Sequence, residues 1–363
     1  MCGSLSLSRS FVRSGTVALA IAGMGSVGLV TPVVPRAVAA STAVVTPTGA
    51  RTGATRVPFA INDQVSASVD VGTGNLSVST VDRSVPGISG MVNFGLSYQS
   101  LALGSGSQIT SGAAGTGWFL LLGQDNRVIA NTDGTVLLLA SDAQQGRFAP
   151  VSGSSSYTSP AGMQKKRLVK NADGTYSLTD LASRAVSKFG TDGRLVSLTD
   201  RNQQSITFTY SGGNVSQATL PTGQVVSFTF SAGKLASMTR PANGALSAGT
   251  ATYKYDTAGH LTSIVRPAVA GAPASTTTFL YSATGDLETV FDGTGGVTRF
   301  GYDAGHRVVS VARGSTTDLA TTRFSYVSST QTLVAAPTTD QTAGVSAVPH
   351  TTYTLNADKR VSA

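Results

Sequence analysis

Three histidines, His260, His306 and His350, are the side chains that could most directly bind a metal ion or transfer a proton. His260 and His306 hold different places in segments that are four predicted strands apart. At about 4.8 Å per strand, even equivalent places would lie roughly 20 Å from each other, which is too far to share one metal ion. His350 lies in a segment without a regular pattern. We therefore expect turn and surface histidines, and we assign no metal site.

Two carboxylates offer another kind of chemistry. Asp286 and Glu288 are two residues apart on a predicted strand, which would put them on one face about 6 to 7 Å from each other. Inverting glycosidases separate their two carboxyl groups by about this distance. However, Asp286 also fills the variable place after a turn. Other segments fill that place with Arg194, Asn214, Lys234 and His260. We therefore interpret Asp286 as a turn residue, and the sequence predicts no catalytic residue and no cofactor.

The composition indicates which elements carry these residues. Charged residues make up only 12% of the chain, and Glu288 is its single glutamate. Long solvated helices use Glu, Lys and Ala, whereas this chain is rich in Ser, Thr and Val and contains 41 glycines. Such a mixture favours many short strands that are joined by tight turns. The expected fold class is all-β.

The first 40 residues are typical of an export signal. Two arginines, Arg9 and Arg13, precede an apolar run over Val17–Val30, and the small residues Ala37–Ala40 form a cleavage site. The run is shorter than the roughly 20 residues that span a bilayer, so we expect no membrane span after cleavage. The only cysteine, Cys2, leaves with the signal. This excludes disulfides, cysteine nucleophiles and thiolate metal sites from the mature protein, which we expect to be secreted or associated with the cell wall.

The charge of the mature chain is mildly basic. The full chain carries +8, and the signal holds three arginines and no acid, so 8 minus 3 leaves +5. Lys165–Arg167 is the only basic cluster, and no aromatic residues are interleaved with it. We expect no nucleic-acid binding. A weak attraction to an anionic cell wall is compatible with this charge.

The mature chain divides by its patterns. Residues 41–57 have no apolar period and are expected to be a flexible linker. Residues 58–185 form a β-rich segment with irregular spacing, in which Asp133-Gly134 and Asp173-Gly174 are hairpin signals. We refer to residues 58–185 as the leading segment.

Residues 186–326 repeat a regular unit. Each unit has two aromatic residues at i and i+2, a turn, and then two aliphatic residues that are three apart. Successive first aliphatics, starting at Leu195, are separated by 20, 20, 26, 26 and 21 residues. The aromatic pairs are Phe208/Tyr210, Phe228/Phe230, Tyr253/Tyr255, Phe279/Tyr281, Phe300/Tyr302 and Phe324/Tyr326. Both rings of a pair lie on one strand face, so each unit is predicted to be a hairpin whose neighbours must stack to bury that face.

The units resemble a known repeat family. Tyr255–Leu261 reads Tyr-Asp-Thr-Ala-Gly-His-Leu, and Tyr302–Val308 reads Tyr-Asp-Ala-Gly-His-Arg-Val. They resemble the YD repeats of bacterial RHS proteins, which recur as Tyr-Asp-x-x-Gly-Arg-Leu. Val71–Leu76 and Asn171–Tyr176 resemble the segment that precedes the repeats in this family. The resemblance covers roughly residues 61–326.

Some features depart from the family. The Asp after the aromatic residue is present at Asp256 and Asp303 but is replaced elsewhere, so it is not a uniform ligand. Beyond Tyr326 the pattern decays, and residues 327–363 are expected to be a degenerate repeat or a partly disordered tail. The family's self-cleaving core and C-terminal toxin are not recognisable in this sequence.

The resemblance implies a coiled antiparallel β-strip of repeated hairpins, a YD shell or spiral, which is incomplete here. It further implies a non-catalytic secreted scaffold that wraps or presents a polypeptide partner such as a toxin. Too few strands are expected for closure, so an open edge near Phe324–Tyr326 would invite self-association.

Two alternatives stay open. One is a cell-wall adhesin or glycan-binding module, in which aromatic residues such as Trp118 would stack on sugars, although Trp118 beside Phe119 is more typical of a plug at the end of a sheet. The other is a β-solenoid enzyme that cleaves polysaccharides.

Overall fold

A computed structural model describes residues 49, 51, 53–88, 90–105, 107–242, 247–268, 273–337 and 340–362. These residues belong to one compact unit of residues 41–363. The expected signal, residues 1–40, lies outside the described residues. Within the described ranges the regular elements are strands and two short 3₁₀ turns, so the all-β prediction is confirmed.

The leading segment supplies the small sheets. The first, called here the N-terminal sheet, has the order β1 (Arg56–Asn62), β2 (Val65–Asp70), β3 (Leu76–Thr80), β6 (Leu96–Gln99) and β9 (Trp118–Leu120). Two hairpins flank it: β4 (Arg83–Gly87) with β5 (Gly90–Phe94), and β7 (Ser111–Gly112) with β8 (Gly115–Thr116). A 3₁₀ turn, η1 (Ser100–Leu103), follows β6. A four-stranded sheet contains β10 (Arg127–Ala130), β11 (Val136–Leu139), β12 (Gln145–Pro150) and β13 (Tyr157–Thr158).

A single antiparallel sheet of 17 strands carries the repeats, with its strands in chain order. Its first strands are β14 (Lys166–Lys170), β15 (Tyr176–Asp180), β16 (Val186–Phe189), β17 (Leu195–Thr199), β18 (Ser205–Ser211), β19 (Asn214–Thr219), β20 (Val225–Ser231) and β21 (Lys234–Arg240). Its later strands are β22 (Gly249–Tyr255), β23 (Leu261–Arg266), β24 (Ser275–Tyr281), β25 (Leu287–Phe291), β26 (Val297–Tyr302), β27 (Val308–Gly314), β28 (Leu319–Ser328), β29 (Gln331–Ala335) and β30 (Thr351–Thr354). Another 3₁₀ turn, η2 (Val345–Ala347), precedes β30.

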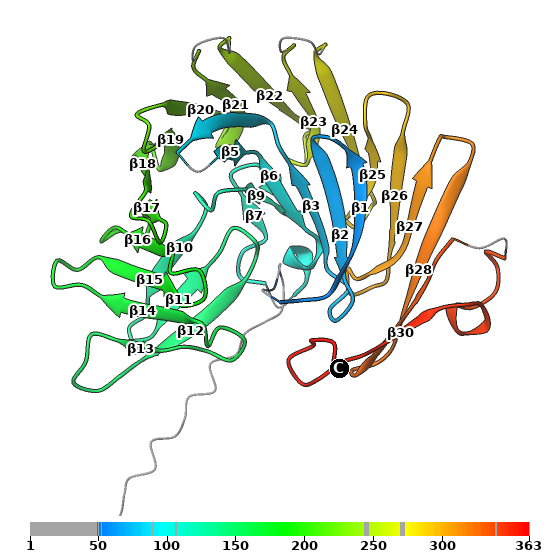
Figure 1. The fold of residues 1–363 in the computed structure, drawn as a ribbon, viewed down its shortest axis with the longest axis horizontal. Coiled ribbons are helices and arrows are strands. Elements are labelled where there is room, and N and C mark those ends of the chain that lie inside the picture. The colour runs from blue at the N-terminus through cyan, green and yellow to red at the C-terminus, as the bar shows by residue number, and fades with distance from the viewer. Residues whose placement is uncertain are drawn as a thin grey trace, which may run out of the picture. The chain divides into compact units, whose positions relative to one another are not determined.

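Figure 1 shows these strands following one another as a curved strip. The two end strands, β14 and β30, do not pair with each other, so the strip is open, as the sequence predicts. The position of the open edge differs from the expectation. Phe324–Tyr326 lies in β28, which pairs on both sides, with β27 and β29, so the edge is β30 instead. The sequence placed the edge too early because the pattern of the later strands is weak.

Most repeat hairpins contain a bulge at the same place, whereas in the last one, formed by β28 and β29, the register shifts after Tyr326. In β24 and β25, Phe279 pairs with Val290 and Tyr281 pairs with Leu287, and the register shifts between Leu280 and Tyr281. Two residues on the aromatic strand thus span three on the aliphatic strand, because the aliphatic strand holds one extra residue. The same register shift lies directly before the second aromatic residue in four other hairpins, formed by β18 and β19, β20 and β21, β22 and β23, and β26 and β27. The bulge lets both aromatic and both aliphatic residues face the core.

The second aromatic residue of most units ties neighbouring hairpins together through its hydroxyl. Tyr281 Oη donates to the carbonyl of Leu261, the first aliphatic residue of the preceding unit, at 2.8 Å. Equivalent bonds join Tyr210 to Leu195, Tyr255 to Leu235, Tyr302 to Leu287 and Tyr326 to Val308, at 2.6 to 2.8 Å. Burial raises the pKa of these tyrosines, so each remains a protonated donor.

The aromatic face of the strip is covered by the N-terminal sheet of the same chain. The Trp118 ring packs edge-on against Phe279 with centroids 5.0 Å apart, and its Nε1–H donates to Tyr281 Oη at 2.8 Å. Two further ring pairs join the leading segment to the strip: Phe59 with Phe324 at 6.5 Å, and Phe94 with Phe228 at 6.3 Å. One continuous apolar core thus contains side chains from both sheets.

The leading segment also accepts hydrogen bonds from backbone N–H groups at three of the bulges. The backbone N–H groups of Leu235, Leu287 and Val308 donate to Ala113 O at 2.8 Å, Tyr98 Oη at 3.0 Å and Gly74 O at 2.9 Å, respectively. Each donor is the first aliphatic residue of its unit. At Gly74, with φ of +76°, an added Cβ would lie 2.6 Å from Arg307 Cβ, so only glycine allows this approach.

The first prediction concerns the aromatic ladder. Tyr281→Ala is expected to lower the free energy of unfolding by about 3 to 5 kcal/mol, because it removes a packed ring. Tyr281→Phe should cost about 1 to 3 kcal/mol, because Trp118 Nε1 loses its acceptor and the Leu261 carbonyl loses its donor. Denaturant unfolding measures both. Leu280→Ala, on the opposite and exposed face of β24, is the matched control and should change stability by less than about 0.5 kcal/mol. An unchanged midpoint for Tyr281→Ala would contradict the buried ladder.

The second prediction concerns alkaline pH. The folded state raises the pKa of several tyrosines above the ordinary value near 10, so it retains protons that the unfolded chain loses. This contribution to stability is complete below about pH 10 and is lost as the pH rises above it. We expect phenolate absorbance to appear together with loss of the β circular-dichroism signal. Ionisation of all ten tyrosines near pH 10 in a protein that stays folded would refute the prediction.

Candidate functional site

The histidines occupy separate structural positions. His260 Nδ1 lies 3.0 Å from Asp256 Oδ2, and its ring stacks on Tyr281 with centroids 4.7 Å apart. His350 Nδ1–H donates to the carbonyl of Val348 at 2.8 Å. Over the described ranges no group of three or more His, Cys, Asp or Glu side chains is arranged to hold a metal ion.

His306 lies in the turn before β27 and has φ of +60°, in the place that glycine takes in other turns, as the sequence indicates. Its Nδ1 lies 2.8 Å from Asp286 Oδ1. Asp286 is 2% exposed, whereas Glu288 is exposed. The prediction that these two carboxylates share one strand face is therefore wrong. Asp286 lies in the turn before β25, where strand alternation does not apply, and its carboxylate is held between His306 and Thr284.

Trp118 is fully buried between Tyr98 and Phe279. Its indole contacts the strip and has no exposed face on which a sugar could stack. The interpretation as a plug is the one that the structure supports.

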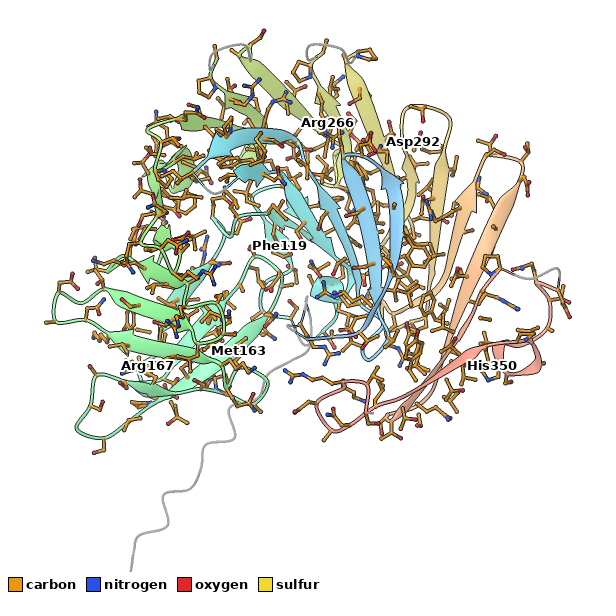
Figure 2. The ribbon with its side chains drawn as sticks, in the orientation of Figure 1. Phe119, Met163, Arg167, Arg266, Asp292 and His350 are labelled. Atoms are coloured by element: carbon orange, nitrogen blue, oxygen red, sulfur yellow. The ribbon has the colours of Figure 1, made fainter. Side chains whose placement is uncertain are left out.

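Lys166 and Arg167 of the basic cluster lie on β14, and Lys165 directly precedes it. Lys166 forms an ion pair with Asp180 at 2.7 Å. Partial burial opposes the charged carboxylate, but the Lys166 ammonium and the Ser183 N–H outweigh it and lower the pKa of Asp180 to about 2. Arg167 points away from the sheet (Figure 2). Of these three cations, Lys166 thus forms an ion pair within the sheet. The cluster as a whole lies on a partly solvated face.

The structure contains a buried ionic network that was not predicted from the sequence. Asp82, in the leading segment, accepts hydrogen bonds from Arg266 at 3.0 and 2.6 Å and from Tyr253 Oη at 2.8 Å. The Asp82 and Arg266 side chains are 0% and 1% exposed. This pair joins the leading segment to β23, and removal of either partner would leave a buried charge. The one signal was Arg before Pro at the end of two aliphatic strands, at Arg240-Pro241 and Arg266-Pro267.

Among the hollows that the described residues form, two border the repeat hairpins. An apolar groove of about 380 Å³ lies between the β4–β5 hairpin and strands β17 and β18, and the exposed Ile88 and Met91 border it. A more polar cavity of about 400 Å³ lies where three hairpin turns meet the loops on either side of β9.

Among the described residues no helix is long and apolar enough to cross a membrane.

Comparison with known proteins identifies the repeat. The family model described as RHS Repeat matches residues 191–225, which run from the turn before β17 to the start of β20. No curated protein matches the chain.

Three solved structures match part of this chain at low identity. A crystal structure of TcdB2-TccC3 without its hypervariable C-terminal region is 15% identical, with a TM-score of 0.33, over 71% of this chain and 16% of that one. TcdB2-TccC3-TEV is 15% identical, with a TM-score of 0.35, over 82% and 17%. A Photorhabdus luminescens Tc holotoxin pore with a TccC3 mutation is 14% identical, with a TM-score of 0.36, over 81% and 17%. The chain spans about a sixth of the length of these proteins.

The matched residues contain the bulged hairpin that ends in Tyr210 and Val215, with its hydroxyl bond to the preceding unit. The later hairpins of the strip have the same bulge and the same pairing of aromatic with aliphatic residues. The chain therefore contains an RHS, or YD, repeat at residues 191–225, and hairpins of the same form follow it.

Proposed function

We propose that this chain is a non-catalytic scaffold of a secreted RHS-type protein, and that it presents its outer surfaces to a polypeptide partner such as a toxin. The RHS repeat supports the scaffold role. One observation favours presenting over wrapping: the aromatic face of the strip packs against the chain's own N-terminal sheet. That face is not free for a cargo, so the partner binds elsewhere.

The edge strand β30 is the surface that best suits a polypeptide. Leu355 N–H donates to Thr330 O at 2.8 Å, which fixes the direction of the alternating groups, so that Thr352 N–H and C=O point away from β29. The turn after β30 covers part of this edge, since Ser362 N–H donates to Thr354 O at 2.9 Å. Thr352 is exposed and remains able to pair with an added strand.

The third prediction tests this edge. Thr352→Pro removes the outward N–H without breaking the ladder with β29, because proline is tolerated on edge strands. We expect the variant to weaken association at least about tenfold, whether with a second copy or with the exported product of the neighbouring gene. Light scattering over a concentration series and co-elution measure the two cases.

Thr352→Ala keeps the N–H and is the matched control, so it should associate as the unmodified chain does. Sharp monomer peaks for the unmodified chain at high concentration, with no co-elution, would contradict strand addition at β30.

The fourth prediction concerns localisation. We propose that the segment before residue 41 is a cleaved signal, because an apolar run follows Arg9 and Arg13 and ends before Ala37–Ala40. Expression in a secreting host should release a chain whose amino terminus, by Edman or mass-spectrometric sequencing, is Ala40 or Ser41. A membrane-bound product that still begins with Met1 would refute it.

A further inference from the structure

The polar cavity lies at the repeat unit whose second aromatic residue is phenylalanine instead of tyrosine. Its walls come from the turns before β17, β19 and β21 and from the loops on either side of β9, and its volume of about 400 Å³ is within the range of ligand sites. Phe230 and Val215 both line it. We propose that this cavity binds one sugar unit of a glycan.

Phe230 is the second aromatic residue of its unit, the place that tyrosine holds in the units on both sides. Tyr210 and Tyr255 each donate a hydroxyl hydrogen bond to the first aliphatic residue of the preceding unit. The equivalent acceptor for Phe230 is Val215 O, and phenylalanine has no hydroxyl to offer. The Val215 carbonyl therefore lacks the donor that this place supplies in the other units.

The N–H of Val215 also lacks a partner that three other units have. In the hairpins of Leu235, Leu287 and Val308 the leading segment supplies an acceptor to this N–H. No described residue of the leading segment does so for Val215. An N–H that has an acceptor in three other units and a carbonyl that has a donor in five thus lie together at the cavity. A hydroxyl group can serve both, because it donates one hydrogen bond and accepts others.

The remaining walls suit a polyol. Asn214 and Arg127 line the cavity, and neither side chain forms a hydrogen bond or ion pair with another residue in the described part of the chain. Gln124 is 5% exposed, and its Oε1 is buried without a partner among those residues. Phe230 presents a half-buried ring. The C–H face of a sugar ring packs on such a ring, while its hydroxyls reach the amides.

Charged groups decide which sugars bind best. Arg194 pairs with Asp192 at 3.3 Å and lies over the Tyr210 ring. The Asp125 carboxylate accepts the backbone N–H groups of Leu120 and Ala113 and is thereby occupied. Arg127 attracts the buried Asp125 carboxylate but forms no ion pair or hydrogen bond with it in the described part of the chain. Its guanidinium N–H groups therefore remain able to bind a sugar carboxylate, and a sugar that carries one should bind more tightly than a neutral one.

The fifth prediction tests the site with two probes, a hyaluronan tetrasaccharide and neutral chitotetraose, titrated calorimetrically into the mature chain. Both should bind, the acidic probe more tightly. Phe230→Tyr supplies the hydroxyl that the other units have, so it should weaken both affinities at least tenfold while leaving the thermal midpoint unchanged or higher. Asn214→Ala should also weaken both, and Arg127→Gln should remove the preference for the acidic probe.

Tyr302→Phe is the reverse change in a unit outside the cavity and should leave both affinities unchanged. If neither probe binds at millimolar concentration, the proposal is overturned. Binding that Phe230→Tyr and Asn214→Ala leave unaltered would do the same. Neither result bears on strand addition at β30, which is measured without saccharide.

Discussion

The packing of the N-terminal sheet against the aromatic face of the repeat strip is the interaction on which the rest of the structure depends. A strip of hairpins has one apolar face, and it is stable only when a second layer covers that face. Here the second layer comes from the same chain, with Trp118 bound to both Phe279 and Tyr281 at the interface. The repeats are therefore one layer of a two-layer core.

The bulge connects this packing to the polar groups of the backbone. Because each aliphatic strand holds one extra residue, the N–H of the first aliphatic residue leaves the ladder in several units. The leading segment accepts it at Leu235, Leu287 and Val308, and a tyrosine of the next unit donates to the carbonyl of the same three residues. Each unit thus has the same pair of polar contacts to satisfy, and the unit of Val215 satisfies neither from these two sources.

Local patterns predict much of the strip and little of what covers it. The hairpins, the face shared by Phe279 and Tyr281, and the turn at His306 follow from spacing and residue type. The bulge was also accessible, since aromatics two apart must face aliphatics three apart. In contrast, Asp82 and Arg266 are separated by 184 residues, and no local pattern joins them. The alternation that placed Asp286 beside Glu288 fails because Asp286 belongs to a turn.

Trp118 is the only tryptophan of the chain, so its fluorescence reports directly on the contact between the two layers. The decisive measurement is the emission of the native mature chain, with acrylamide quenching, compared with that of the chain in denaturant. A covered strip predicts native emission at the short wavelengths of an apolar site and little quenching, both lost together on unfolding. Native emission and quenching equal to those of the unfolded chain would show that the N-terminal sheet does not cover the repeats.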